Sequence, residues 1–167
     1  MKKLFSLTFL LLFAVTGLFA QGKAKEQRKS PHDTVKTANM KIAYGRPYKK
    51  GRDIFGGLEA YGKVWRAGAD EATQITFAKD CNVVGRPVKA GTYTLFVIPN
   101  QNEWTLILNT KLGQWGAYEY DKSKDVLNAA VAAGKLDNVV EQFTIEATAE
   151  GIKMSWDKTT ATFPITF

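Results

Sequence analysis

The sequence contains very little of the two residue types that most often build covalent, metal-binding or acid–base sites. Cys81 is the only cysteine and His32 the only histidine among 167 residues. One cysteine excludes a disulfide within the chain, and the pair is too small a set for zinc, which takes three or four protein ligands. We therefore expect no metal and no cofactor, and we expect Cys81 to be a buried, unreactive thiol.

The shortage of histidine also argues against a Ser-His-acid enzyme, which needs a base that exchanges its proton near neutral pH. His32 follows Ser30 and Pro31 and precedes Asp33. This surrounding is more typical of a residue that enters a strand and caps backbone groups than of a catalytic base. No catalytic residue is assigned.

Long apolar runs are confined to the start of the chain. Lys2 and Lys3 precede an apolar stretch over residues 4–19, and Ala20 supplies a small residue for cleavage. This pattern is typical of a secretory signal peptide, and no later run is long enough to cross a bilayer. We expect residues 1–20 to be a signal peptide and the mature chain to be periplasmic or secreted, with no membrane span.

Excess charge is also modest once that segment is removed. Residues 1–20 carry two lysines and no acid, so the net charge falls from +7 to +5. Several of the remaining positive charges lie in residues 21–30, which we interpret as a flexible linker, and no nucleic-acid partner is expected. The remaining residues 31–167 have the length of one domain.

The last third of the chain alternates apolar and polar residues with the period of a strand. Three such stretches cover residues 143–148, 152–157 and 161–167, with a glycine-containing turn after the first and a predicted second turn at 157–160. They predict a three-stranded meander. Pro164 predicts that the last strand lies at an edge, because proline has no N–H for the ladder.

The middle of the chain predicts a buried hairpin. Residues 92–98 are apolar at nearly every position, which indicates a strand covered on both faces and ended by Pro99, and residues 104–108 form its partner. Residues 125–134 fit either a short helix or a strand, and the alternation favours the strand. Further short strands are expected at residues 40–44, 73–77 and 81–84.

These elements predict an all-β, antiparallel sandwich or jelly-roll-like barrel. The segment from Gly45 to Gly68 differs from the rest, because it holds six glycines and few periodic positions. It is expected to be a long, ordered loop over one end of the fold.

Several sequence blocks together resemble one known family of exported bacterial proteins, a domain of unknown function. They are SPHDTVK (30–36), YGRPYKKGRDIFGGLEAYGKVWRAGADEAT (44–73), AGTYTLFVIP (90–99), EWTLILN (103–109) and QWGAYEYD (114–121). The chain departs from the family pattern at Asp70, where asparagine is usual, and at Asn128, where a basic residue is usual. The resemblance implies an exported β-rich domain and brings no established activity.

The glycine-rich segment also carries three arginines, Arg46, Arg52 and Arg66. Planar guanidinium groups bind carboxylate, sulfate or phosphate well, and glycine lets backbone N–H groups approach such a ligand. Aromatic residues interleave with them at Tyr44, Tyr48, Phe55, Tyr61 and Trp65. The alternative is that the arginines pair with Asp53, Asp70 and Glu71 and only stabilise the loop.

A second aromatic group follows a glycine turn, where Trp115, Tyr118 and Tyr120 are placed as in sugar-stacking sites, although core packing is the alternative. Acids at loops or strand ends suggest a glycosidase-type pair, but sequence gives no separation between them. They are Glu59, Asp70, Glu71, Glu103 and Glu119. Calcium at Asp121 and Asp125 is disfavoured by the lysines between them.

The leading prediction is an exported, non-catalytic ligand-binding or interaction domain for an anionic small molecule or a glycan. The predicted ligand-binding residues are Arg46, Arg52, Trp65, Arg66, Trp115 and Tyr118. The alternatives are a hydrolase that uses loop carboxylates and a structural component of the cell envelope.

Overall fold

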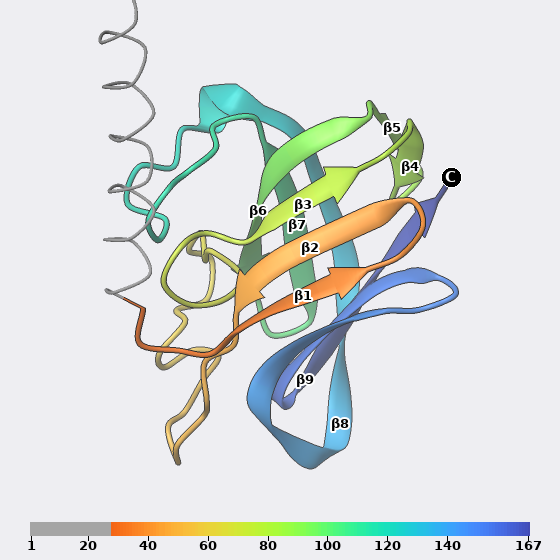
Figure 1. Ribbon diagram of the computed structural model, residues 1–167. Coiled ribbons are helices and arrows are strands. Elements are labelled where there is room, and N and C mark those ends of the chain that lie inside the picture. Colours follow the sequence, from red (N-terminus) through yellow and green to blue (C-terminus); the bar gives the residue numbers. More distant parts are fainter. Residues whose placement is uncertain (1–27) are drawn as a thin grey trace, which may run out of the picture.

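The computed structural model describes residues 28–167, and every strand in this range belongs to one antiparallel sheet (Figure 1). The strands are β1 (His32–Lys36), β2 (Met40–Gly45), β3 (Gln74–Phe77), β4 (Cys81–Val83), β5 (Arg86–Val88), β6 (Gly91–Pro99), β7 (Glu103–Asn109), β8 (Asp125–Ala147) and β9 (Gly151–Thr166). Their order in the sheet is β1-β2-β3-β6-β7-β8-β9-β4-β5. The predicted all-β, antiparallel class is confirmed.

Helical structure in the described range is limited to one 3₁₀ turn, η1 (Lys122–Lys124). Between residues 28 and 167 no helix is long and apolar enough to cross a membrane. The predicted signal peptide at residues 1–20 and most of the predicted linker at 21–30 lie outside the described residues.

The central hairpin of β6 and β7 is buried on both faces, as predicted. Alternate residues of a strand point to opposite sides of the sheet. Leu95 and Leu106 belong to the main core, whereas Phe96 and Ile107 pack on the other side with Ala72. The continuous apolar run in this part of the sequence therefore serves two apolar clusters at once.

The C-terminal region is built from two long strands, so the predicted meander of three strands is wrong. β8 runs continuously through both 125–134 and 143–147, and the preference for a strand at 125–134 is confirmed. β9 passes through residues 157–160 without a turn. Asp157 instead takes a left-handed conformation, with φ 53°, opposite register shifts in β8. Irregularities of this kind bend a strand pair without ending it.

Pro164 does not mark an edge strand, because β9 lies between β8 and β4. Ile165 pairs with Val83, and the Pro164 carbonyl accepts a hydrogen bond of 2.8 Å from the Val84 N–H. Proline lacks an N–H but has a carbonyl group, and Pro164 contributes only this carbonyl to the pairing with β4. The edges of the sheet are β1 and β5, two short strands that the alternation pattern did not predict.

The long strands bend until β8 meets the end of β2, which gives the sheet a sandwich-like curvature (Figure 1). The Lys49 N–H donates to the Glu141 carbonyl (2.7 Å), and the Phe143 N–H donates to the Pro47 carbonyl (2.9 Å). The Tyr44 hydroxyl accepts from the Ile145 N–H (2.9 Å). The apolar faces of β2 and β8 therefore enclose one core.

The segment between β2 and β3, residues 46–73, contains only isolated bridges, such as those of Tyr48 to Gln142 and Trp65 to Val97. It nevertheless contributes Ile54, Trp65 and Ala67 to the main core. Packing, rather than a hydrogen-bonded ladder, therefore holds this segment in place.

Candidate functional site

A tight turn over residues 67–70 is pressed against the end of β2. A Cβ atom at Gly45 would lie 2.3 Å from the Ala69 carbonyl oxygen, so only glycine allows this approach. Ala67 (φ 51°) and Asp70 (φ 62°) both take left-handed conformations. Such backbone is costly and persists where surrounding contacts hold it. One such contact is the 2.6 Å hydrogen bond from the Thr73 hydroxyl to the Ala67 carbonyl.

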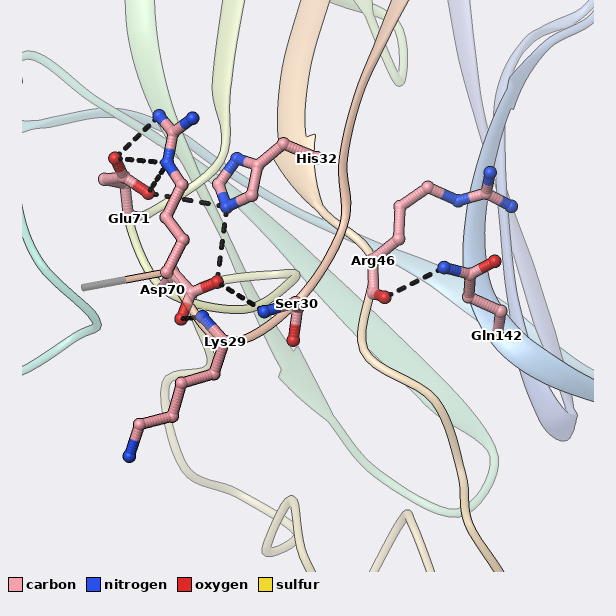
Figure 2. Close-up of polar contacts among 8 residues, drawn as sticks. Lys29, Ser30, His32, Arg46, Asp70, Glu71 and Gln142 are labelled. Atoms are coloured by element: carbon pink, nitrogen blue, oxygen red, sulfur yellow. Dashed lines mark hydrogen bonds and ion pairs between the residues drawn. The ribbon is translucent and has the colours of Figure 1, made fainter. Parts of the chain in front are cut away.

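This turn presents the carboxylate of Asp70 to the N-terminal segment (Figure 2). One oxygen accepts from the Lys29 N–H (3.1 Å), and the other accepts from the Ser30 N–H (3.1 Å). The Nε2 atom of His32 lies 3.3 Å from the latter oxygen. A carboxylate only accepts, so this contact is a hydrogen bond in the tautomer of His32 that carries its proton on Nε2. Both oxygens of the buried Asp70 are therefore occupied.

Glu71 is paired with Arg28 in the same network. The Arg28 Nε donates to both carboxylate oxygens (2.9 and 3.0 Å), and its Nη2 lies 2.7 Å from Oε1. Burial raises the pKa of Glu71, but the hydrogen bond from Arg28, a backbone hydrogen bond and the nearby positive charge of Arg28 together outweigh it, and the pKa is lowered. The same bond raises the pKa of Arg28. His32, placed at the start of β1 as expected, thus contacts acids instead of capping backbone groups.

A cavity of about 430 Å³ lies between the N-terminal segment, the loop after β2 and the 67–70 turn. Its apolar wall includes Trp156 and Pro47, and Tyr48 and Leu58 are partly exposed at its surface. Four cations and two carboxylates line it: Lys29, Lys50, Arg52, Arg66, Glu59 and Asp70. The lining is therefore positive overall.

Arg66 is the cation of this cavity that has a buried donor without a partner. Within residues 28–167 its guanidinium forms no hydrogen bond or ion pair, and its Nε is buried without a partner. Asp70 and Glu71 are both engaged by the N-terminal segment. The alternative in which Arg66 stabilises the loop by pairing with these two acids does not describe the structure. A buried, unpaired polar group is costly and calls for an explanation.

Glu59 is an unpaired acid in the same cavity. Its side chain is partly buried, and it accepts no hydrogen bond from residues in the described part of the chain. Burial raises its pKa to about 7, although the positive charges of Arg66 and Arg52 act in the opposite direction. A partly buried carboxyl group with such a pKa lacks the donors that normally stabilise its charged form.

The other two arginines are held by the fold. Arg46 donates to the Phe143 carbonyl (3.2 Å) and to the Thr144 hydroxyl (2.9 Å), and it pairs with Asp33 (3.2 Å). These bonds join the end of β2 to β8, and the Arg46 carbonyl accepts from Gln142 at the same place (Figure 2).

Arg52 lines the cavity but donates to the carbonyl oxygens of Tyr48 and Lys49 in its own loop. The structure therefore brings only Arg52 and Arg66, of the six predicted ligand-binding residues, into this cavity.

Trp65 is a core residue. It is 3% exposed, its ring stacks on Trp156 with centroids 5.9 Å apart, and its Nε1 donates to the Gly68 carbonyl. Its contribution to the cavity is indirect, through the position of the turn that follows it.

The aromatic loop after β7 lies next to the turn but outside the cavity lining. The Gly116 N–H donates to the Asp70 carbonyl (3.0 Å). Trp115 is 38% exposed and Tyr118 is 87% exposed. Tyr120 instead packs on Phe96 in the smaller apolar cluster, which corresponds to the alternative of core packing.

The remaining candidate residues are dispersed. Glu103 lies by a different hollow, next to Tyr61, and Glu119 pairs with Lys111 (3.0 Å). Cys81 is buried, as expected.

Asp121 accepts from Ser123 at the start of η1, and Asp125 accepts from Asn109 and Tyr120. These bonds give both aspartates structural partners.

Comparison with known protein families places the chain in the family DUF2911, described as a protein of unknown function, whose model matches residues 26–165. The chain belongs to this family, and the resemblance noted from its sequence blocks is confirmed. No curated protein and no solved structure matches the chain.

The sequence analysis named Glu59 only as one of five loop acids, and it missed the network that occupies Asp70 and Glu71. The adjacent acids after the turn were visible in the sequence. Their partners, Arg28 and His32, are about forty positions away, so no local pattern connects them.

Proposed function

We propose that this protein is an exported, non-catalytic domain that binds a small anionic ligand in the cavity lined by Arg66 and Arg52. The observation that carries the proposal is that Arg66, a residue of the cavity lining, has a buried Nε without a partner and forms no ion pair with a nearby acid. A guanidinium group binds carboxylate, sulfate and phosphate through parallel hydrogen bonds. An anion bound beside Arg66 would accept the hydrogen bonds that no residue in the described part of the chain accepts.

Two further features support an anion rather than a cation. The cavity is lined by four positive side chains and only two acids, and the oxygens of Asp70 are already occupied. Its volume of about 430 Å³ lies within the range of small-molecule sites, roughly 300–1,000 Å³.

The test is a titration of the mature protein with sulfate, phosphate and acetate at low ionic strength, followed by NMR chemical shifts. We expect saturable shifts at residues around the cavity. Arg66→Ala should weaken binding at least about tenfold, because the direct contact to the anion is lost. Its stability should change by less than about 1 kcal/mol, because the removed group has no partner in the fold.

Arg86→Ala is the matched control, because Arg86 is an exposed arginine on the edge strand β5 and lies outside the cavity. It should bind like the unmodified protein. Equal binding by the Arg66→Ala and Arg86→Ala variants would overturn the proposal, as would a linear response to anion concentration without saturation.

A further inference from the structure

The cavity contains one hydrogen-bond donor and one acceptor that have no partner in the described part of the chain, and its ligand should satisfy both. Arg66 is a donor without an acceptor, and Glu59 is an acceptor without a donor. Both residues line the same cavity, and they form no ion pair with each other. A ligand of matching shape therefore reaches both groups at once.

A simple anion satisfies only half of this site. Sulfate or acetate on Arg66 leaves the Glu59 carboxyl group without a donor and places a second negative charge near it. Like charges at short range are unfavourable in a partly buried site. A ligand that turns a donor towards Glu59 removes this penalty and adds a hydrogen bond to a charged acceptor.

The charge of the cavity lining favours a neutral donor on the ligand over a positively charged one. Lys29, Lys50 and Arg52 surround the same hollow, so an ammonium group would enter a region that is positive overall. A hydroxyl group carries no charge and meets no such repulsion. It also donates to Glu59 whether or not that carboxyl group is protonated.

An aromatic ring, that of Tyr48, lies at the surface of the cavity. Tyr48 lines the hollow and is 39% exposed, and the exposed Leu58 lies on the same lining. Aromatic rings with one exposed face pack well against the apolar face of a sugar ring.

We propose that the ligand class is a sugar acid, with its carboxylate on Arg66, a hydroxyl group on Glu59 and its ring against Tyr48. This inference rests on the proposed anion site and specifies what that site prefers.

The experiment compares glucuronate, acetate and glucose by calorimetric titration. Glucuronate should bind at least about tenfold more tightly than acetate, since an analogue that lacks the hydroxyl groups leaves a partly buried polar group unpaired. Glucose should show no saturable binding, because it lacks the group for Arg66.

Glu59→Ala should lower the ratio of the acetate and glucuronate dissociation constants severalfold, to what the contact of the sugar ring with Tyr48 contributes. It should also tighten acetate binding, because a competing negative charge is removed. Glu59→Gln, which preserves the shape of the side chain, should lower the same ratio and covers the case in which the alanine variant does not fold. Arg86→Ala should leave the ratio unchanged.

Saturable acetate binding without a preference for glucuronate would overturn the sugar-acid assignment and leave the anion site standing. A preference of undiminished size in both Glu59 variants would overturn the role of Glu59 and the assignment with it. Absence of saturable binding by every probe would overturn the anion site as well.

Discussion

Replacement of Trp156 by alanine tests the packing beneath the cavity. Trp156 lies in β9, is fully buried and forms part of the cavity wall. Its ring stacks on Trp65 and also meets Phe143 and Phe55, with centroids 5.9–6.2 Å away. Removal of the indole group takes away the side chain that these three rings share.

The size of the effect follows from the buried area. A buried aromatic side chain covers about 150–250 Å², which corresponds to roughly 4–6 kcal/mol at about 25 cal/mol per Å². This is an upper value, because unfolded chains already bury part of their surface. The Nε1 hydrogen bond to the Glu141 carbonyl is long, at 3.4 Å, and adds little. We expect Trp156→Ala to cost about 3–5 kcal/mol, as for other large aromatic truncations.

Urea unfolding followed by circular dichroism measures this loss. For a domain of this size, about 1 kcal/mol lowers the melting temperature by about 2–4 °C, so a fall of about 6–20 °C is expected. Lys153→Ala is the control, because Lys153 lies in the same strand, is partly exposed, and has a side chain that forms no hydrogen bond or ion pair within residues 28–167. It should change stability by less than about 0.5 kcal/mol. Equal, small losses in both variants would refute the assignment of the core face of β9.

Two further predictions concern the turn and the cavity acid. Gly45→Ala should cost about 1–3 kcal/mol, because the added Cβ would lie 2.3 Å from the backbone oxygen of Ala69. Gly134→Ala should cost less, because its Cβ would lie 3.1 Å from the Thr160 methyl group and 3.7 Å from the Thr160 oxygen, and identical melting curves for the two variants would contradict this expectation. The pKa of Glu59 is about 7 in the folded protein, against an ordinary value of 4.5. Between these two pH values the folded state keeps a proton that the unfolded state releases. The free energy of unfolding of the wild type should therefore fall by up to about 3 kcal/mol between pH 4.5 and 7 through this group. Glu59→Gln should therefore become more stable relative to the wild type as pH rises from 5 to 8 in urea unfolding, and a difference independent of pH would show that the Glu59 pKa is ordinary.

The apolar pattern along the chain, continuous at residues 92–98 and alternating elsewhere, was sufficient to predict most of the strands. Residues 92–98 and 104–108 form β6 and β7 as expected, and residues 152–157 form part of β9. The period of two is a local property, since successive residues of a strand face opposite sides of the sheet, and each residue is polar or apolar according to whether its side is exposed or buried. The short edge strands β1 and β5 lack this signal, because few of their side chains are buried.

Only the tertiary structure decided where the long strands continue. Residues 157–160 have the polar composition of a turn, yet β9 passes through them, and Asp157 forms an ion pair with Lys49 (2.9 Å). A bulge and a turn place similar residues in a similar pattern, and the choice between them depends on the partner strand. The same applies to Pro164, whose tolerance in the sheet depends on which of its backbone groups the neighbour uses.

In the candidate site, too, the sequence predicted some features and only the tertiary structure decided others. Composition alone drew attention to the arginines between residues 45 and 68, but it did not show which arginine lacks a partner. Arg46 is occupied by β8, while Arg28 and the N-terminal backbone occupy the acids next to Arg66. Ion pairs form between groups that the fold brings within a few ångströms, and those groups come from distant parts of the chain. The sequence by itself therefore determined the kinds of side chain available, and only the folded backbone decided that Arg66 and Glu59 remain unpaired in one cavity.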